Sequence, residues 1–229
     1  MSINKQRLAT ICFSLFFSSP LLSKTTVITE DFEDHQYNWS YQLHPRGISI
    51  IDEPSSNNKN KVALFELTGE DYFNWKGNPG LNRCELQFKP NETSSNSQTF
   101  FNWRFKIPDY LSDEEYQIAY AESDTSYKQA FRLQVKARYL ELYSTAENKL
   151  LWRSNINLNR DWYDISLEIL WHEEKGRLSL SINNKPVFSG YTITKIEKEN
   201  MFFQVGLLRK NESSVAKMFL DDLSIITTL

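Results

Sequence analysis

From Thr25 onward, the hydrophobic residues recur at every second position far more often than at helical spacing. The stretch 61–67 reads Lys-Val-Ala-Leu-Phe-Glu-Leu, and the stretch 131–135 reads Phe-Arg-Leu-Gln-Val. Such alternation in segments rich in β-branched and aromatic residues predicts β-strands. Turn-forming stretches rich in Ser, Asn, Gly and Pro separate the strands at 53–60, 77–80 and 90–97. The pattern therefore predicts an all-β protein.

One hairpin is predicted near the end of the chain. The alternating stretches 176–182 and 186–188 flank Asn183 and Asn184, two residues that accept the positive φ of a tight turn. The segment 194–200 is the one amphipathic candidate for a helix, and it is too short for more than one or two turns. No internal repeat interrupts this organisation.

The first residues have the pattern of a secretory signal. Lys5 and Arg7 precede an apolar run over 8–22 that ends in small and polar residues. A membrane anchor needs about 20 uninterrupted apolar residues, and this run is broken by Ser14, Ser18, Ser19 and Pro20. We therefore expect a signal peptide over 1–24, one domain over 25–229, secreted or periplasmic localisation, and no membrane attachment after cleavage.

Length and charge restrict the class of protein. The 229 residues, 40% of them hydrophobic, suit a single β-rich domain. Removing Lys5, Arg7 and Lys24 with the signal leaves 23 cations against 29 acids, a net charge of −6. This balance argues against nucleic-acid binding, whereas a cleft with clustered cations would still attract an acidic polysaccharide. Cys84 is then the one remaining cysteine, so no internal disulfide forms and we expect a monomer stabilised by packing.

Three segments, in order along the chain, resemble the alginate-lyase and heparin-lyase-I-like families of polysaccharide lyases. They are Asn-Arg-Cys-Glu-Leu at 82–86, Gln-Ile-Ala at 117–119 and Phe-Phe-Gln-Val-Gly-Leu-Leu-Arg at 202–209. The resemblance implies a concanavalin-like β-jelly roll, in which two curved antiparallel sheets form a sandwich with a concave cleft. It also implies cleavage of uronic-acid polymers by β-elimination, without a required cofactor.

The first segment is similar to the families' Arg-x-Glu-Leu strand. Alternation places Arg83, Glu85 and Gln87 on one face, and Cys84 and Leu86 on the other. The resemblance implies that Arg83 forms a bidentate, charge-assisted contact with a uronate carboxylate and that Glu85 orients it. A surface ion pair is the alternative interpretation.

The other two segments depart from the families' pattern at the positions that transfer protons. Gln117 matches, but Ala119 stands where these families have histidine, and Leu208 stands at the tyrosine position. Tyr120 is the nearest substitute, although alternation places it on the opposite face from Gln117 unless a bulge shifts the strand. His44 is a second candidate, and an exposed loop histidine is its alternative interpretation.

Further polar side chains alternate with apolar ones along the predicted strands. If their faces line the concave sheet, they bind substrate; otherwise, they face water on the outside of a half-buried sheet. These substrate-binding candidates, beside Glu85 and Gln87, are Arg104, Lys106, Arg132, Gln134, Gln204 and Arg209. Where the first and last strands pair, Glu30 and Asp222 would hold a structural Ca²⁺ or remain solvated edge charges.

Two functions remain open, and a third finds less support. The first is a lyase acting on an acidic polysaccharide, with Arg83 and Gln117 stabilising the charge that develops on the substrate. The second is a non-catalytic carbohydrate-binding or matrix protein, in keeping with Ala119 and Leu208. A glycoside hydrolase would need two carboxylates across the cleft, and the chain lacks the closely spaced acidic strand expected for one.

Overall fold

The computed structural model describes residues 24–34, 38–39, 41–43, 47–54, 60–70, 72–75, 78–89, 92–109, 111, 114–155, 158–210 and 212–229. These ranges contain sixteen β-strands, and none of their residues lies in an α-helix. No helix in the described part of the chain has the length and apolar character needed to cross a membrane. Of the predicted signal peptide only Lys24 is described, so export remains a prediction.

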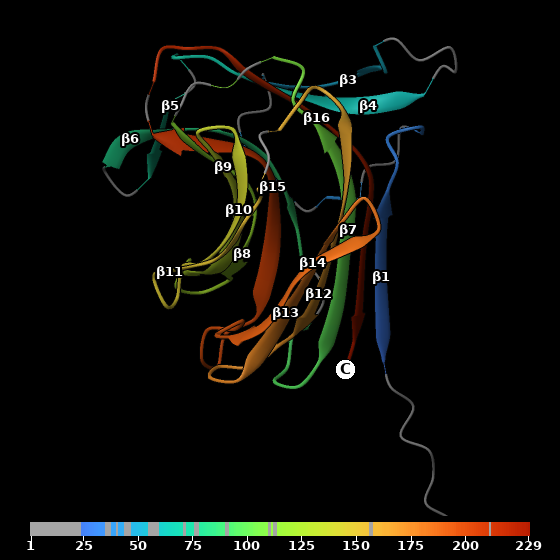
Figure 1. Cartoon of the computed structure of the whole chain (residues 1–229), viewed down its shortest axis with the longest axis vertical. Helices are drawn as coiled ribbons and strands as arrows, with labels where there is room; N and C mark the ends of the chain where they lie inside the picture. Colours follow the sequence, from blue (N-terminus) through green and yellow to red (C-terminus); the bar gives the residue numbers. More distant parts are fainter. Residues whose placement is uncertain are drawn as a thin grey trace, which may run out of the picture.

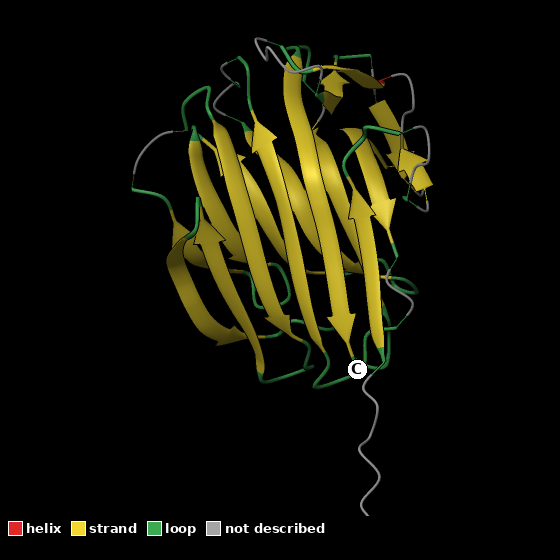
Figure 2. Ribbon diagram, turned by 90° about the vertical axis from the view of Figure 1, so that its right-hand side faces the viewer, coloured by secondary structure: helices red, strands yellow, loops and turns green. Residues whose placement is uncertain are grey.

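The strands form two antiparallel sheets that face each other (Figure 1). We call one of them the back sheet, and Figure 2 shows its strands side by side. Its order is β14 (Lys185–Thr192), β13 (Gly176–Ile182), β12 (Trp162–Leu170), β7 (Gln98–Lys106), β16 (Ala216–Thr228), β4 (Lys61–Leu67) and β3 (Ile48–Asp52). Strand β1 (Thr25–Glu30) pairs with β16. The predicted pairing of the first and last strands is therefore confirmed.

The second sheet, the concave sheet, curves strongly in Figure 1 so that its hollow side faces away from the back sheet. Its order is β11 (Lys149–Arg153), β10 (Tyr139–Ser144), β9 (Gln129–Lys136), β8 (Glu115–Ser123), β15 (Met201–Lys210), β6 (Asn78–Phe88) and β2 (Tyr41–Leu43), with β5 (Tyr72–Trp75) paired to β6. We call its hollow side the open face. The predicted β-jelly roll is confirmed.

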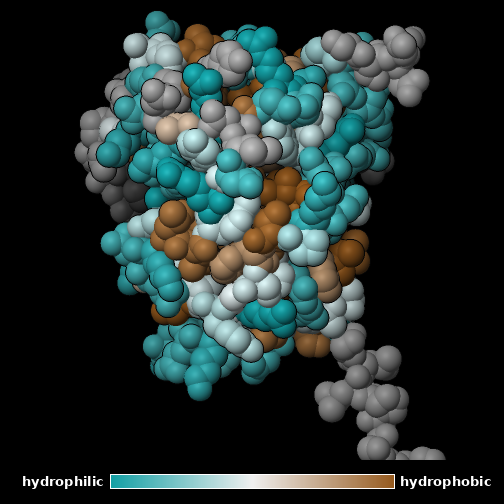
Figure 3. Space-filling model, viewed as in Figure 1, coloured by the Kyte–Doolittle hydropathy of each residue, from teal (hydrophilic) through white to brown (hydrophobic). Residues whose placement is uncertain are grey.

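The core lies between the sheets because each strand turns its apolar alternate positions inward. Phe101 on β7 contacts Phe203 on β15, with 4.4 Å between the ring centroids. Trp171, fully buried, packs against Phe203 at 5.8 Å and donates its indole hydrogen to the Thr99 hydroxyl at 2.7 Å. Hydrophilic side chains cover much of the face in Figure 3, between smaller apolar groups, as expected for strands that are half-buried.

The hairpin near the end of the chain is confirmed. Strands β13 and β14 pair, and Asn183 and Asn184 turn between them with φ of 50° and 61°. Two consecutive positive φ values define the turn whose twist matches that of a β-hairpin. The segment 194–200, the candidate for a short helix, forms turns instead.

Arg209 does not reach the open face, which corrects its assignment as a substrate-binding residue. It is 2% exposed at one end of the core, because Leu207 on β15 points inward and Arg209 shares its side. Its guanidinium donates to Asn82 Oδ1 at 3.3 Å, to the Tyr116 hydroxyl at 3.0 Å and to Ser214 Oγ at 2.9 Å. Its role is to tie together the ends of β6, β8 and β15.

We expect Arg209→Ala to lower the free energy of unfolding by about 3 kcal/mol, because its buried partners would lose a charged donor. Urea unfolding measures this change. Lys210→Ala is the matched control, since Lys210 is exposed and a surface substitution typically changes stability by less than about 0.5 kcal/mol. Equal stability of the two variants would contradict a structural role for Arg209.

Candidate active site on the concave sheet

The open face of β6 carries the polar residues of the first motif. Cys84 and Leu86 are fully buried in the core, so Arg83, Glu85 and Gln87 point to the opposite side. This confirms the predicted alternation. Both Arg83, at 8% exposure, and Glu85, at 1%, are shielded by their neighbours on the curved sheet.

Arg83 connects side chains from three strands. Its Nε donates to Glu85 Oε2 at 2.6 Å, and its Nη2 donates to the Tyr120 hydroxyl at 2.7 Å and to Gln204 Oε1 at 3.0 Å. Gln204 in turn donates from Nε2 to Glu122 Oε2 at 2.8 Å. These five residues form a continuous hydrogen-bonded cluster, which we call the Arg83 cluster.

A bulge in β8 brings Tyr120 into this cluster. In the pairing with β15, Gln117 lies opposite Leu208, whereas Ala119 lies opposite Val205, and the pairing with β9 shifts at the same place. The bulge therefore changes the alternation beyond Gln117: Ala119 is buried in the core and Tyr120 lies on the open face. The bulge that the sequence left open as an alternative is therefore present, and it places Tyr120 on the face of Gln117.

The remaining motif residues lie on the same sheet. Gln117 is partly buried on the open side of β8, and its Oε1 accepts a hydrogen bond from Gln129 Nε2 at 2.8 Å. Leu208, 6% exposed and outside the core cluster, lies opposite both Gln117 and Arg83 across the strands. The tyrosine position of the related families thus holds an apolar side chain next to the cluster.

Glu122 is a member of the Arg83 cluster that sequence reasoning missed. It follows Tyr120 by two positions on β8, and it is partly exposed. Alternation counted from Tyr120 would have found it, but only if Tyr120 had first been placed on the open face. The bulge that hid the role of Tyr120 therefore hid Glu122 too.

Burial and mutual charge change the titration of these groups. Burial raises the pKa of the Glu122 carboxyl to about 7, although Arg83 and the hydrogen bond from Gln204 act in the opposite direction. Burial, with the charge of Glu85, raises the pKa of the Tyr120 phenol well above its ordinary range. Burial also raises the pKa of Glu85, an effect that Arg83 partly offsets. Tyr120 therefore keeps its proton at neutral pH, whereas Glu122 titrates there.

Arg132 and Gln134 extend the open face across β9. Arg132 donates to Glu115 Oε1 at 2.9 Å, and its guanidinium lies 4.5 Å from the centroid of the Tyr143 ring. Gln134 donates to Glu141 Oε2 at 2.7 Å. The structure therefore places both residues on the sheet of the Arg83 cluster. There, the Arg132 guanidinium and the Gln134 amide already have protein partners.

Arg104 and Lys106 lie on the other sheet, which corrects the idea that they line the concave groove. Both are on β7, where Phe105 between them points into the core and leaves them on the outer side of the back sheet. Arg104 forms ion pairs with Asp221, with Asp222 at 3.0 Å and with Glu53 at 3.9 Å. The charged stripe of β7 is thus the solvent-facing side of a half-buried strand.

The remaining candidates have other surroundings. His44 lies outside the described residues. Glu30 is 3% exposed and accepts the backbone N–H groups of Phe32 at 2.9 Å and Asn38 at 2.8 Å, whereas Asp222 pairs with Arg104. No three His, Cys, Asp or Glu side chains in the described ranges gather so as to hold a metal ion. A structural Ca²⁺ at Glu30 and Asp222 stays a prediction, to be measured by the effect of added Ca²⁺ on thermal unfolding.

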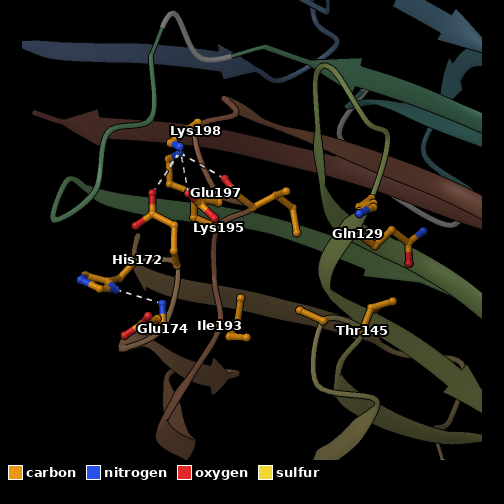
Figure 4. A pocket seen from close by; sticks show the side chains of 12 residues that line it. Gln129, Thr145, His172, Glu174, Ile193, Lys195, Glu197 and Lys198 are labelled. Atoms are coloured by element: carbon orange, nitrogen blue, oxygen red, sulfur yellow. Dashed lines mark hydrogen bonds and ion pairs between the residues drawn. The ribbon is translucent and has the colours of Figure 1, made fainter.

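A cleft between turns lies away from the Arg83 cluster and is shown in Figure 4. It is about 1070 Å³ in volume and is lined by the turns after β8, β10 and β12 and by the segment 193–198. Lys195 Nζ donates to the Glu199 carbonyl at 2.6 Å, and His172 Nδ1 accepts the N–H of Glu174 at 3.0 Å. These polar groups hold the surrounding turns, so the Arg83 cluster remains the candidate active site.

Comparison with known proteins shows the family. The polysaccharide lyase family profile matches residues 29–224. The chain belongs to this family, and its substrate class is therefore polysaccharide. No curated protein sequence gives a significant match.

Solved structures confirm the fold at low sequence identity. Alginate lyase AlgAT5 from polysaccharide lyase family 7 is 12% identical, with a TM-score of 0.60 over 83% of this chain and 86% of that one. The cellulose-induced protein Cip1 is 11% identical, with a TM-score of 0.62 over 86% and 96% of the two chains. The alginate lyase from Corynebacterium sp. is 10% identical, with a TM-score of 0.55 over 72% and 77%.

Proposed function

We propose that this protein is exported, binds an acidic, uronic-acid-containing polysaccharide along its open face, and cleaves it by β-elimination. The observation that carries the proposal is the Arg83 cluster, in which a guanidinium, an amide and a phenol from three strands meet at one place on the open face. A guanidinium is the side chain best suited to bind a planar carboxylate through two hydrogen bonds. The alginate lyases of the same fold support a uronate polymer as the substrate class.

The chemistry assigns separate tasks to Arg83 and Tyr120. As the proton on C5 leaves, negative charge spreads onto the uronate carboxylate, and Arg83 with Gln204 would stabilise that charge. The electrons of the broken C5–H bond then form the C4–C5 double bond, and the C4–O4 bond breaks. The departing O4 needs a proton, and Tyr120, which stays protonated at neutral pH, can donate it. The products are a chain with an unsaturated uronate and a chain with a free hydroxyl.

Tyr120→Phe is expected to lower kcat by about 100-fold or more, because general acid catalysis typically contributes that much. The measurement is the rise of the unsaturated-uronate absorbance when the protein is incubated with alginate, glucuronan or heparin. Tyr191→Phe is the matched control, since Tyr191 is 78% exposed on the back sheet. A Tyr120→Phe variant that cleaves at the rate of the control would contradict the assignment.

One observation favours a second function, binding without cleavage. Ala119 is buried in the core and Leu208 is apolar, so neither position of the related families supplies a proton-transfer group. A carbohydrate-binding protein on this fold would retain affinity for acidic polysaccharides and produce no unsaturated ends. Binding measured by affinity electrophoresis, together with the absorbance assay, separates the two functions.

A further inference from the structure

β-Elimination needs a group that accepts the C5 proton, and the Arg83 cluster restricts the choice. Its described titratable members, apart from Arg83, are Glu85, Tyr120 and Glu122. All three lie on the open face within one or two hydrogen bonds of the guanidinium. The proton acceptor must be able to lose its own proton near neutral pH, be accessible to a sugar ring, and not already be neutralised by the cation that binds the substrate.

Glu85 and Tyr120 do not meet these conditions. Glu85 is 1% exposed, and its carboxylate forms the 2.6 Å ion pair that holds Arg83 in place. Tyr120 accepts a hydrogen bond from Arg83 and keeps its proton because burial raises its pKa. Glu85 is thus a positioning residue, and Tyr120 is suited to donate a proton rather than to accept one.

Glu122 meets all three conditions. It is partly exposed, and the hydrogen bond that it accepts from Gln204 at 2.8 Å occupies one carboxylate oxygen. Gln204 also accepts from Arg83 at 3.0 Å, so a single side-chain amide separates the carboxylate from the guanidinium. A uronate whose carboxylate binds Arg83 has its C5 one bond from that carboxylate. The ring would have to span the Gln204 amide, which is hydrogen-bonded to both Arg83 and Glu122.

We propose that the Glu122 carboxylate is the catalytic base that removes the C5 proton; this inference rests on the proposed function. The carboxylate takes the proton from C5, the C5–H electrons form the C4–C5 double bond, and the C4–O4 electron pair leaves with O4. Tyr120 protonates O4, and solvent returns a proton to Tyr120 and removes one from Glu122. No oxidant, reductant or metal enters this balance.

The groups around Glu122 determine the expected pH dependence. Across the sheet, Glu122 lies opposite Phe202 on β15 and Gln129 on β9, and it accepts a hydrogen bond from Gln204. The charged groups that act on it are Arg83 and Glu85 on β6. Because burial raises the pKa of Glu122 to about 7, the base is half protonated near neutral pH. We expect kcat/KM to rise as the pH increases through about 7 and to level off above it.

The test compares wild-type protein, Glu122→Gln and Glu122→Ala. Glutamine retains an oxygen to accept the hydrogen bond from Gln204 but cannot take a proton. We expect Glu122→Gln to lower kcat about 100-fold or more, to keep affinity for the polymer within about threefold, and to lose the rise of kcat/KM near pH 7. Added formate should restore activity to Glu122→Ala and leave Glu122→Gln unchanged. Glu168→Gln, on the exposed side of β12, is the control.

Each outcome decides the assignment. The assignment is supported if Glu122→Gln loses kcat together with the rise of kcat/KM near pH 7, and if formate restores activity to Glu122→Ala. If Glu122→Gln cleaves as fast as wild-type protein and with the same pH profile, Glu122 is not the base, and the proposed function remains intact. A matched loss of binding and cleavage in a folded Glu122→Gln protein also overturns it, since Glu122 would then bind substrate only. If wild-type protein cleaves none of the polymers, the base and the proposed cleavage both fail.

Discussion

Replacing Arg83 with lysine is expected to reduce cleavage by at least about 100-fold and to weaken binding of an acidic polysaccharide. Truncating one partner of a buried, hydrogen-bonded charge pair costs about 2–5 kcal/mol, and each 1.4 kcal/mol corresponds to a tenfold change. Lysine keeps a positive charge next to Glu85, but it lacks the fork that joins Glu85, Tyr120 and Gln204. Unsaturated-uronate absorbance and affinity electrophoresis measure the two effects.

Lysine is preferred to alanine for this experiment because Glu85 is 1% exposed. Without a neighbouring cation, burial would raise the pKa of Glu85 further, and the variant would mix a folding defect with a functional one. Arg104→Lys is the control, since Arg104 lies on the back sheet and pairs with Asp221 and Asp222. If Arg83→Lys binds and cleaves like this control, Arg83 is not the carboxylate-binding group.

Gly206→Ala is expected to destabilise the protein by about 4 kcal/mol or more, or to prevent folding. Gly206 has φ of +149°, a conformation that side chains rarely adopt, and an added Cβ would lie 2.2 Å from the Cys84 carbonyl oxygen and 2.7 Å from Glu85 Cα. Both atoms belong to the backbone of β6, so they cannot move without breaking the pairing of β6 with β15. Urea unfolding measures the loss.

Gly190→Ala provides the matched comparison. At Gly190 the nearest atom to an added Cβ is Cζ of Phe188 at 2.7 Å, the far end of a side chain that can move. We expect its effect to be below about 1.5 kcal/mol. Similar stabilities of the two variants would contradict a backbone constraint at Gly206. Gly206 also lies where the pairing of β15 with β8 shifts, so it supports the bulge that brings Tyr120 to Arg83.

Much of the fold follows from local pattern. Period-two alternation predicts strands because successive side chains point to opposite faces, and paired asparagines predict a tight turn because they tolerate positive φ. For the same reason, the side shared by Arg83, Glu85 and Gln87 was predicted correctly, since no bulge interrupts β6 between them. The three ordered motifs also indicated the family that the whole-chain comparison shows.

The sequence by itself thus determined the fold class, the family and the central arginine, but only the tertiary structure decided which polar residues meet it. Alternation distinguishes the two faces of a strand without saying which sheet the strand joins, so Arg104 on the back sheet and Arg132 on the concave sheet look alike in sequence. The bulge at Gln117–Ala119 depends on pairing with β15 and β9, which lie far away in sequence or across a turn. One shifted residue exchanges the faces of Ala119 and Tyr120, because the side-chain period of a strand is two.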